Sequence, residues 1–193
     1  THTSASTDVS YNGLAVASVN VASVDNDAPK IVINEIDADQ AATDMAEFVE
    51  LYDGGVGNVS LNGKILVFFN GAAANDGSYL TIDLSGKSTN AAGFFVVGNA
   101  GVAGAGLTFP NNTLQNGADA VALYSALASA FPNGTAPTLT GLLDAIVYDT
   151  DDADDAGLLA LLDNSVEVQP QVNENQNGGT SGETQSLARV PDG

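Results

Sequence analysis

The 193-residue sequence contains no cysteine, which excludes disulfides and thiol chemistry. Secretion is still possible, because a chain with 44% hydrophobic residues can build the core of one domain without cross-links. Tryptophan is also absent, and the single histidine is His2, in a polar N-terminal stretch. Ser-His-Asp and Cys-His catalytic arrangements therefore have no candidate histidine in the body of the chain. No apolar run approaches the length of a membrane span, so membrane insertion is not expected.

Basic residues are scarce. The chain has 24 Asp and Glu against 4 Lys and Arg, which gives a formal net charge of −20. Nucleic-acid binding needs a basic patch that neutralises phosphates, so no nucleic-acid partner is predicted, and anionic membrane surfaces are disfavoured for the same reason. The acidic surface has two interpretations. It keeps the protein soluble in salt, or it suits a protein outside the cell in a saline or calcium-rich medium, where cations screen the carboxylates.

The body of the chain consists of short β-type runs separated by turns rich in Gly, Asn and Asp, the pattern of a sandwich. Two continuous apolar runs, ILVFF (65–69) and FFVVG (94–98), predict strands that are covered on both faces. The alternating FVEL (48–51) predicts a strand with Phe48 pointing inward. The predicted strands cover residues 31–37, 46–53, 63–70, 78–83, 93–98, 119–124, 142–148 and about 186–190.

One helix is predicted, over residues 151–163, with Asp151 or Asp152 as its N-cap. Residues 101–106 and 107–117 are expected to form a flexible turn and an irregular connection. Residues 169–185, which are polar and rich in Gly and Asn, are expected to form a long loop.

Several of these segments resemble, in their order, the bacterial secreted form of the lamin tail domain, over residues 30–193. The resemblance implies an all-β, immunoglobulin-like β-sandwich with one short helix, which binds or scaffolds and is not an enzyme. Arg189, in the closing SLARVPDG, is then expected to be a structural salt-bridge partner. The matching segments are IVINEIDADQAATDMAEFVELYDGG (31–55), LNGKILVFFNG (61–71), YLTIDLSG (79–86), AGFFVVGN (92–99), LQNGADAVALY (114–124) and GLLDAIVYDT (141–150).

Residues 1–29 form a separate N-terminal extension. The alternating LAVASVNVASV (14–24) predicts an extra strand, which ends before Pro29 in an acidic Asp-Asn-Asp linker. It resembles the last strand of calcium-associated Ig-like repeats in bacterial surface proteins. Because an orphan strand must pair with something, it is expected to join the domain's own sheet or to insert into a neighbouring copy. The residues expected to carry this assembly are Leu14, Val16, Val19, Val21 and Val24.

Calcium is the predicted cofactor, because hard cations take several carboxylate and carbonyl oxygens. The favoured site joins the linker to the loop after the first strand of the domain, through Asp25, Asn26, Asp27, Asp37 and Asp39. Two other acidic sets are weaker candidates, Asp44 with Glu47 and the run Asp149, Asp151, Asp152, Asp154 and Asp155. The run is not an EF-hand, because Asp154 takes the required glycine position, and a solvated loop with a helix cap explains most of it.

Glu35 and Glu50 lie on neighbouring predicted strands. They are expected to pair with Lys64, Lys87 or Arg189, or to cap loop amides, with a shared metal site as the alternative.

The chain is predicted to be a secreted, non-enzymatic module, and three functions are considered in order of preference. The first is a structural module of the cell exterior that assembles with itself. The second is an accessory targeting or spacer domain of a larger secreted protein, such as a nuclease or a surface adhesin. The third is a calcium-dependent glycan binder that uses Tyr52, Tyr79 and Phe109 as its aromatic platform. The first residue is Thr1 rather than Met, which a removed export signal would explain, as would a sequence given in part.

Overall fold

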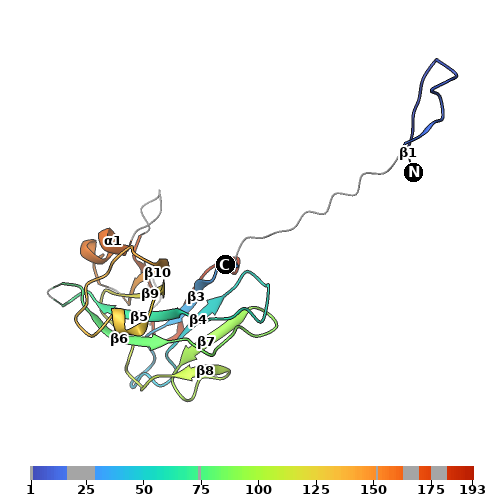
Figure 1. Cartoon of the computed structure of the whole chain (residues 1–193). Coiled ribbons are helices and arrows are strands. Elements are labelled where there is room, and N and C mark those ends of the chain that lie inside the picture. The colour runs from blue at the N-terminus through green and yellow to red at the C-terminus, as the bar shows by residue number, and fades with distance from the viewer. Residues whose placement is uncertain (1, 17–28, 74, 151, 163–169, 175–181) are drawn as a thin grey trace.

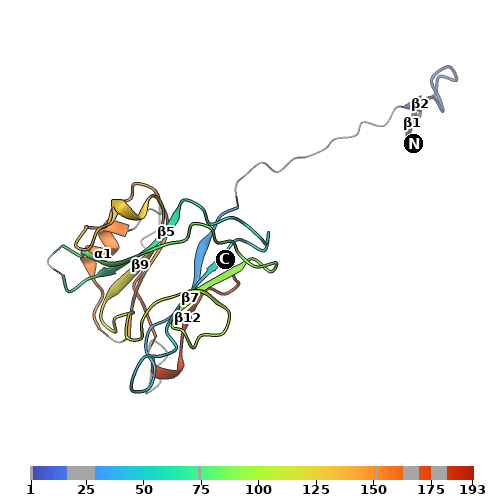
Figure 2. The same ribbon diagram turned by 60° about the horizontal axis from the view of Figure 1, so that its bottom comes forward.

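The chain folds into two five-stranded β-sheets that pack face to face, in a computed structural model that describes residues 2–16, 29–73, 75–150, 152–162, 170–174 and 182–193. We name the layers the β5–β9 sheet and the β4–β7 sheet after their central strands (Figures 1 and 2). The β5–β9 sheet has the order β11 (Val172–Asn173), β10 (Leu142–Asp149), β9 (Asp119–Ser125), β5 (Lys64–Asn70) and β6 (Ser78–Asp83). The β4–β7 sheet has the order β12 (Leu187–Ala188), β3 (Val32–Asp37), β4 (Phe48–Tyr52), β7 (Phe94–Gly98) and β8 (Ala105–Thr108).

The prediction of an all-β sandwich with one short helix is confirmed. All eight strands predicted for the body of the chain are present, with bounds that differ by a few residues at most. Most pairings are antiparallel, but β10 pairs with β11 and β7 pairs with β8 in parallel, so both sheets are mixed. In the part of the chain that the structure describes, no helix is long and apolar enough to cross a membrane.

The main core lies between the two sheets. Ile33, Val49 and Leu51 from one sheet face Phe68 and Val121 from the other, and all five are fully buried. A second apolar cluster covers the outer face of the β5–β9 sheet, beneath helix α1 (Ala156–Leu162) and the 3-10 turn η1 (Ala128–Ala130). Figure 1 shows α1 beside β9 and β10 of this sheet.

The continuous apolar run of β5 is explained by these two clusters. Leu66 and Phe68 enter the main core, whereas Ile65, Val67 and Phe69 enter the cluster beneath α1. Both faces of β5 are therefore covered, as its sequence predicted.

Two other predictions about strand faces are wrong. On β4 the buried residues are Val49 and Leu51, while Phe48 is only half-buried on the outer face. Phe48 has the same parity as Glu50, so turning it inward would have buried the Glu50 carboxylate as well. On β7, Phe94 and Val96 are likewise half-buried, so this strand is fully covered on one face only.

Two short strands of the large sheets were not predicted. β8 spans the end of the expected flexible turn of residues 101–106 and the start of the stretch expected to be irregular, and β11 lies in the expected loop of residues 169–185. Their pairing partners are the parallel strands β7 and β10, so neither belongs to a hairpin that the local sequence could reveal.

The helix is present but shorter than predicted, and its cap is neither Asp151 nor Asp152. Asp155 is the N-cap, because its Oδ1 accepts hydrogen bonds from the backbone N–H groups of Gly157 (2.8 Å) and Leu158 (2.9 Å). Asp152 is exposed and Asp151 lies outside the described residues.

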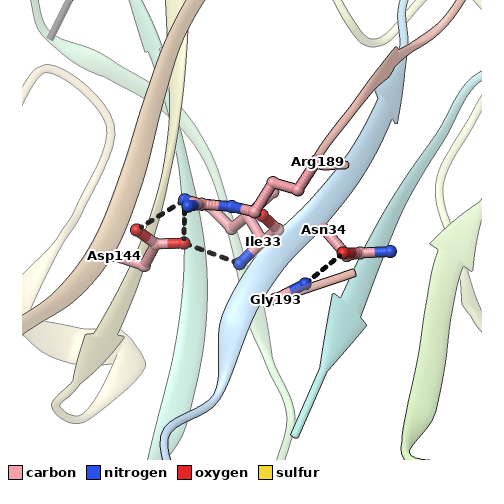
Figure 3. A network of polar contacts seen from close by, with 5 residues as sticks. All are labelled: Ile33, Asn34, Asp144, Arg189 and Gly193. Carbon is pink, nitrogen blue, oxygen red and sulfur yellow. Dashed lines mark hydrogen bonds and ion pairs between the residues drawn. The ribbon is translucent and has the colours of Figure 1, made fainter. Parts of the chain in front are cut away.

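The predicted structural role of Arg189 is confirmed, and its partner is Asp144. The guanidinium donates two hydrogen bonds to the Asp144 carboxylate, at 3.0 and 2.9 Å (Figure 3). Asp144 also accepts the Ile33 N–H at 2.7 Å, at a point where both β3 and β10 carry register irregularities. The ion pair therefore joins one sheet to the edge of the other. Burial raises the pKa of Asp144, and Arg189 acts against that rise.

We expect Arg189→Met to lower the free energy of unfolding by about 1–3 kcal/mol, because it leaves the largely buried Asp144 carboxylate without its cation. The double variant Arg189→Met with Asp144→Leu should recover part of the loss. Urea unfolding of the single and the double variant measures these changes in the free energy of unfolding. A single variant as stable as the parent chain would contradict the structural role.

Candidate interaction surface

An open groove of about 330 Å³ lies on the outer face of the β4–β7 sheet. Its floor is apolar and comes from β7, while its wall carries a carboxylate, a hydroxyl and an amide. That volume is at the lower end of the range found for small-molecule pockets. The lining residues are Glu50, Ser88, Asn90, Phe94, Phe95, Val96, Ala103 and Gly104.

Among the described residues, Glu50 is the one ionisable side chain that lines the groove. It accepts a hydrogen bond of 3.0 Å from the Asn34 side-chain amide. Burial raises the pKa of Glu50, with further increases from the charges of Glu35 and Asp192, while the Asn34 hydrogen bond opposes the shift. An apolar floor with one carboxylate beside it is the kind of lining found in ligand-binding pockets.

Of the two structural roles expected for Glu35 and Glu50, pairing with Lys64, Lys87 or Arg189 is wrong, because in the described part of the chain neither carboxylate forms an ion pair with these residues. The two residues are directly opposite each other on β3 and β4. Glu35 accepts a hydrogen bond from the Ser186 hydroxyl and Glu50 accepts one from Asn34, whereas Arg189 pairs with Asp144. Two like charges therefore remain on the outer face of this sheet.

The predicted aromatic platform does not exist as a unit. Phe109 is buried in the main core, and Tyr79 packs against the same core. Tyr52 is half-buried on the outer face, where its ring stacks on Phe94 with centroids 4.6 Å apart. The aromatic surface beside the groove therefore comes from Tyr52 and Phe94, which are neighbours across strands and far apart in the sequence.

Several carboxylates of this acidic chain are buried and accept hydrogen bonds from loops. Glu47 is completely buried, and its two oxygens accept the N–H groups of Thr113 (3.0 Å) and Leu114 (2.7 Å) and the Asn99 amide (3.0 Å). Asp53 is also buried and accepts the N–H groups of Val56 and Gly57. Part of the acidic composition is therefore structural.

The described part of the predicted calcium site is held by amides. Asp37 accepts a hydrogen bond from the Gln40 side chain (2.6 Å), and Asp39 accepts one from the Asn116 side chain (3.1 Å). Burial raises the pKa of Asp37 to about 6. Residues 25–27 lie outside the described residues, so calcium binding at this site stays a prediction. Within the described ranges, no three Asp, Glu or His side chains are placed to hold one metal ion.

Residues of the two weaker acidic sets also accept hydrogen bonds from backbone N–H groups. Asp44 accepts the Gln40 N–H at 2.9 Å and Glu47 holds the loop described above. Asp149 is buried and accepts the Thr150 N–H (2.6 Å) and the Asp152 N–H, while Asp154 is exposed.

In the part of the chain that the structure describes, four buried side-chain oxygen atoms have no hydrogen-bond partner: Tyr79 Oη, Tyr148 Oη, Asp119 Oδ2 and Glu174 Oε2. Asp119 and Glu174 are each 2% exposed, and both act electrostatically on the fully buried Tyr148. Burial raises the pKa of Asp119 to about 7 and that of Glu174 to about 8. These two carboxyl groups are easier to bury in their protonated forms, and nothing in the sequence marked them.

The N-terminal segment is paired with itself. β1 (His2–Thr3) and β2 (Ala15–Val16) form a two-stranded antiparallel sheet separate from the two large sheets (Figure 1). The predicted strand of residues 14–24 therefore begins as expected, but its first partner is residues 2–3. Val19, Val21 and Val24 lie outside the described residues. Leu14 is 51% exposed, and Val9 and Tyr11 nearby are 89% and 60% exposed.

Comparisons with models of protein families, with curated proteins and with solved structures each gave no match. The lamin-tail resemblance therefore stays a prediction, and the immunoglobulin-like arrangement stays one with it.

Proposed function

We propose that this chain is a non-catalytic scaffolding module of the cell exterior, of lamin-tail type, which assembles by donating the strand of residues 14–24 to a neighbouring copy. The observation that carries the proposal is the N-terminal segment. Its two-residue strands are too short to be stable in isolation, yet it exposes Val9, Tyr11 and Leu14.

The hydrogen bonds of this segment support the proposal. Ser4 N–H donates to Leu14 O (3.0 Å) and Gly13 N–H donates to Ser4 O (2.9 Å). Those that the structure describes for residues 2–16 all stay inside the segment. An alternating apolar strand with such weak local support gains most by adding to the edge of a larger sheet.

Deleting residues 1–24 should abolish assembly. We expect the intact chain to form oligomers or filaments in calcium-containing buffer, and the deletion variant to be a monomer with an unchanged melting temperature of the sandwich. Light scattering after gel filtration and negative-stain electron microscopy measure both, with a chelator added in a parallel sample.

The accessory-domain function is the other outcome of this experiment. Monodisperse single particles in both samples would refute self-assembly and favour a targeting or spacer module. Polymers that form equally well without residues 1–24 would show that the donor strand is not the cause.

A further inference from the structure

The two large sheets have four edge strands, and they differ in how they are protected. Both β11 and β12 are two residues long. The edge of β6 is covered by the segment after η1, since Ser78 N–H donates to Thr135 O, Gly134 N–H donates to Ser78 O and Thr81 Oγ1 donates to Phe131 O. β8 has four residues and alternating exposure, and no strand of the described chain pairs with its outer side. It is therefore the edge most open to strand addition.

The charge of the chain is distributed unevenly around this edge. From residue 84 to residue 143, the sequence has a single acidic residue, Asp119, and a single basic one, Lys87. Asp119 is only 2% exposed. Within residues 84–143, which include β7 and β8, no carboxylate is therefore exposed, although the chain has a net charge of −20. The neighbouring strand β4 contributes one half-buried carboxylate, Glu50, to the groove.

The donor segment has the same property. Residues 9–24 carry no charged side chain, and acidic residues stand on both sides, at Asp8 and Asp25. Two copies that each carry −20 repel each other over most of their surfaces. Electrostatic repulsion opposes contact least where the uncharged donor segment meets β8, which has no charged residue.

The groove adjoins this edge. Ala103 and Gly104, which line the groove, come immediately before β8, and Val96 of the floor is the registered partner of Ala105. Strand addition combines main-chain hydrogen bonds along an edge with pockets that receive alternate side chains. The apolar floor of Phe94 and Val96 gives a strand along β8 a place for small apolar side chains such as valine.

We infer that β8 and the adjoining groove are the acceptor site for residues 14–24 of a second copy. The inference rests on the proposed strand donation and adds the place where the strand binds. It assigns the valines of one copy to the groove of the next, so that each subunit both gives and receives a strand. Such a head-to-tail contact generates open filaments or closed rings.

Cysteine cross-linking tests the acceptor site cleanly, because the chain has no cysteine of its own. Donor chains carry Val16→Cys, Val19→Cys or Val21→Cys, which covers several possible registers. Acceptor chains lack residues 1–24 and carry Thr108→Cys on β8. The matched control acceptor carries Ala188→Cys on β12, which is also an exposed position on an edge strand of the same sheet.

We expect at least one donor to cross-link to Thr108→Cys about tenfold or more faster than to Ala188→Cys, because a disulfide forms only between backbones a few ångströms apart. Mass spectrometry of the linked peptides identifies the pair. If the intact chain assembles but all three donors prefer Ala188→Cys, or do not discriminate, then β8 is not the acceptor while strand donation survives. If the intact chain is a monomer at every concentration, strand donation fails and the acceptor site fails with it.

A second variant checks the charge argument. Thr108→Asp places a carboxylate on the uncharged edge and should weaken assembly, whereas Ala188→Asp should leave it unchanged. Equal assembly by both variants would contradict the role assigned to the uncharged surface.

Discussion

The free energy of unfolding is expected to fall by several kcal/mol as the pH rises from about 5.5 to about 9. Burial raises the pKa of Asp119 to about 7 and that of Glu174 to about 8, while both groups titrate near 4 in an unfolded chain. Between these values the folded chain holds more protons than the unfolded chain. The stabilisation from these groups is therefore complete below about pH 4 and is lost as the pH rises through 7 to 8.

The size of this effect follows from the shifts. One pKa unit corresponds to about 1.4 kcal/mol, so each carboxyl group taken alone contributes at most roughly 4–5 kcal/mol over the whole range from its unfolded to its folded pKa. Both side chains are 2% exposed, so solvent screens them little. Urea unfolding at several pH values measures the slope. The lowest pH that this experiment can use is set by the isoelectric point near 4.1, because there the chain loses the net charge that keeps it soluble.

Asp119→Asn and Glu174→Gln should each flatten this pH dependence, because the amide oxygens keep the hydrogen bonds to Gly71 N–H and Ala38 N–H without the titration. Asp83→Asn is the matched control, since Asp83 is exposed and its hydrogen bonds to Ser85 lower its pKa. About 0.5 M salt screens the general repulsion of the acidic surface but leaves buried groups largely unaffected. A slope that survives both substitutions would show that these two carboxyl groups do not cause it.

Glu47→Ala is expected to lower the free energy of unfolding by about 3–5 kcal/mol. Its carboxylate receives the N–H groups of Thr113 and Leu114 and the side-chain amide of Asn99, and the residue is fully buried. Each buried donor that loses its acceptor costs about 1–3 kcal/mol. Burial raises the pKa of Glu47, and the hydrogen bonds act against that rise, which is the balance expected of a carboxylate kept for its contacts.

The loss should be concentrated in the loop that Glu47 holds. Amide hydrogen exchange at Thr113 and Leu114 should accelerate strongly in Glu47→Ala, while exchange in β5 should change only as far as global stability does. Glu183→Ala is the control, because Glu183 is exposed in the turn η2 (Gly182–Thr184), and surface substitutions usually change stability by about 0.5 kcal/mol or less. If Glu47→Ala were as stable as this control, the structural role assigned to the Glu47 carboxylate would be contradicted.

The eight strands of the body could be predicted because alternation and continuous apolar runs are local properties of a chain. β8 and β11 could not, since strands of four and two residues that pair in parallel carry no such pattern. The error at Phe48 has a different cause. The alternation in FVEL fixes which residues share a face, and only the opposite sheet decides which face is buried.

The features of the candidate site also fall into those that the sequence determined and those that only the tertiary structure decided. The sequence determined that this chain is an acidic β-sandwich with an uncharged N-terminal segment, because periodicity, composition and charge can be read from neighbouring residues. Only the tertiary structure decided that Glu47 and Asp53 hold loops, that Asp119 and Glu174 are buried without full hydrogen bonding, and that Glu50 stands beside an apolar groove. The pairs responsible, such as Glu47 with Leu114 and Ala38 with Glu174, are 67 and 136 residues apart along the chain. Contacts over such separations depend on the packing of the whole chain, so no local sequence pattern can predict them.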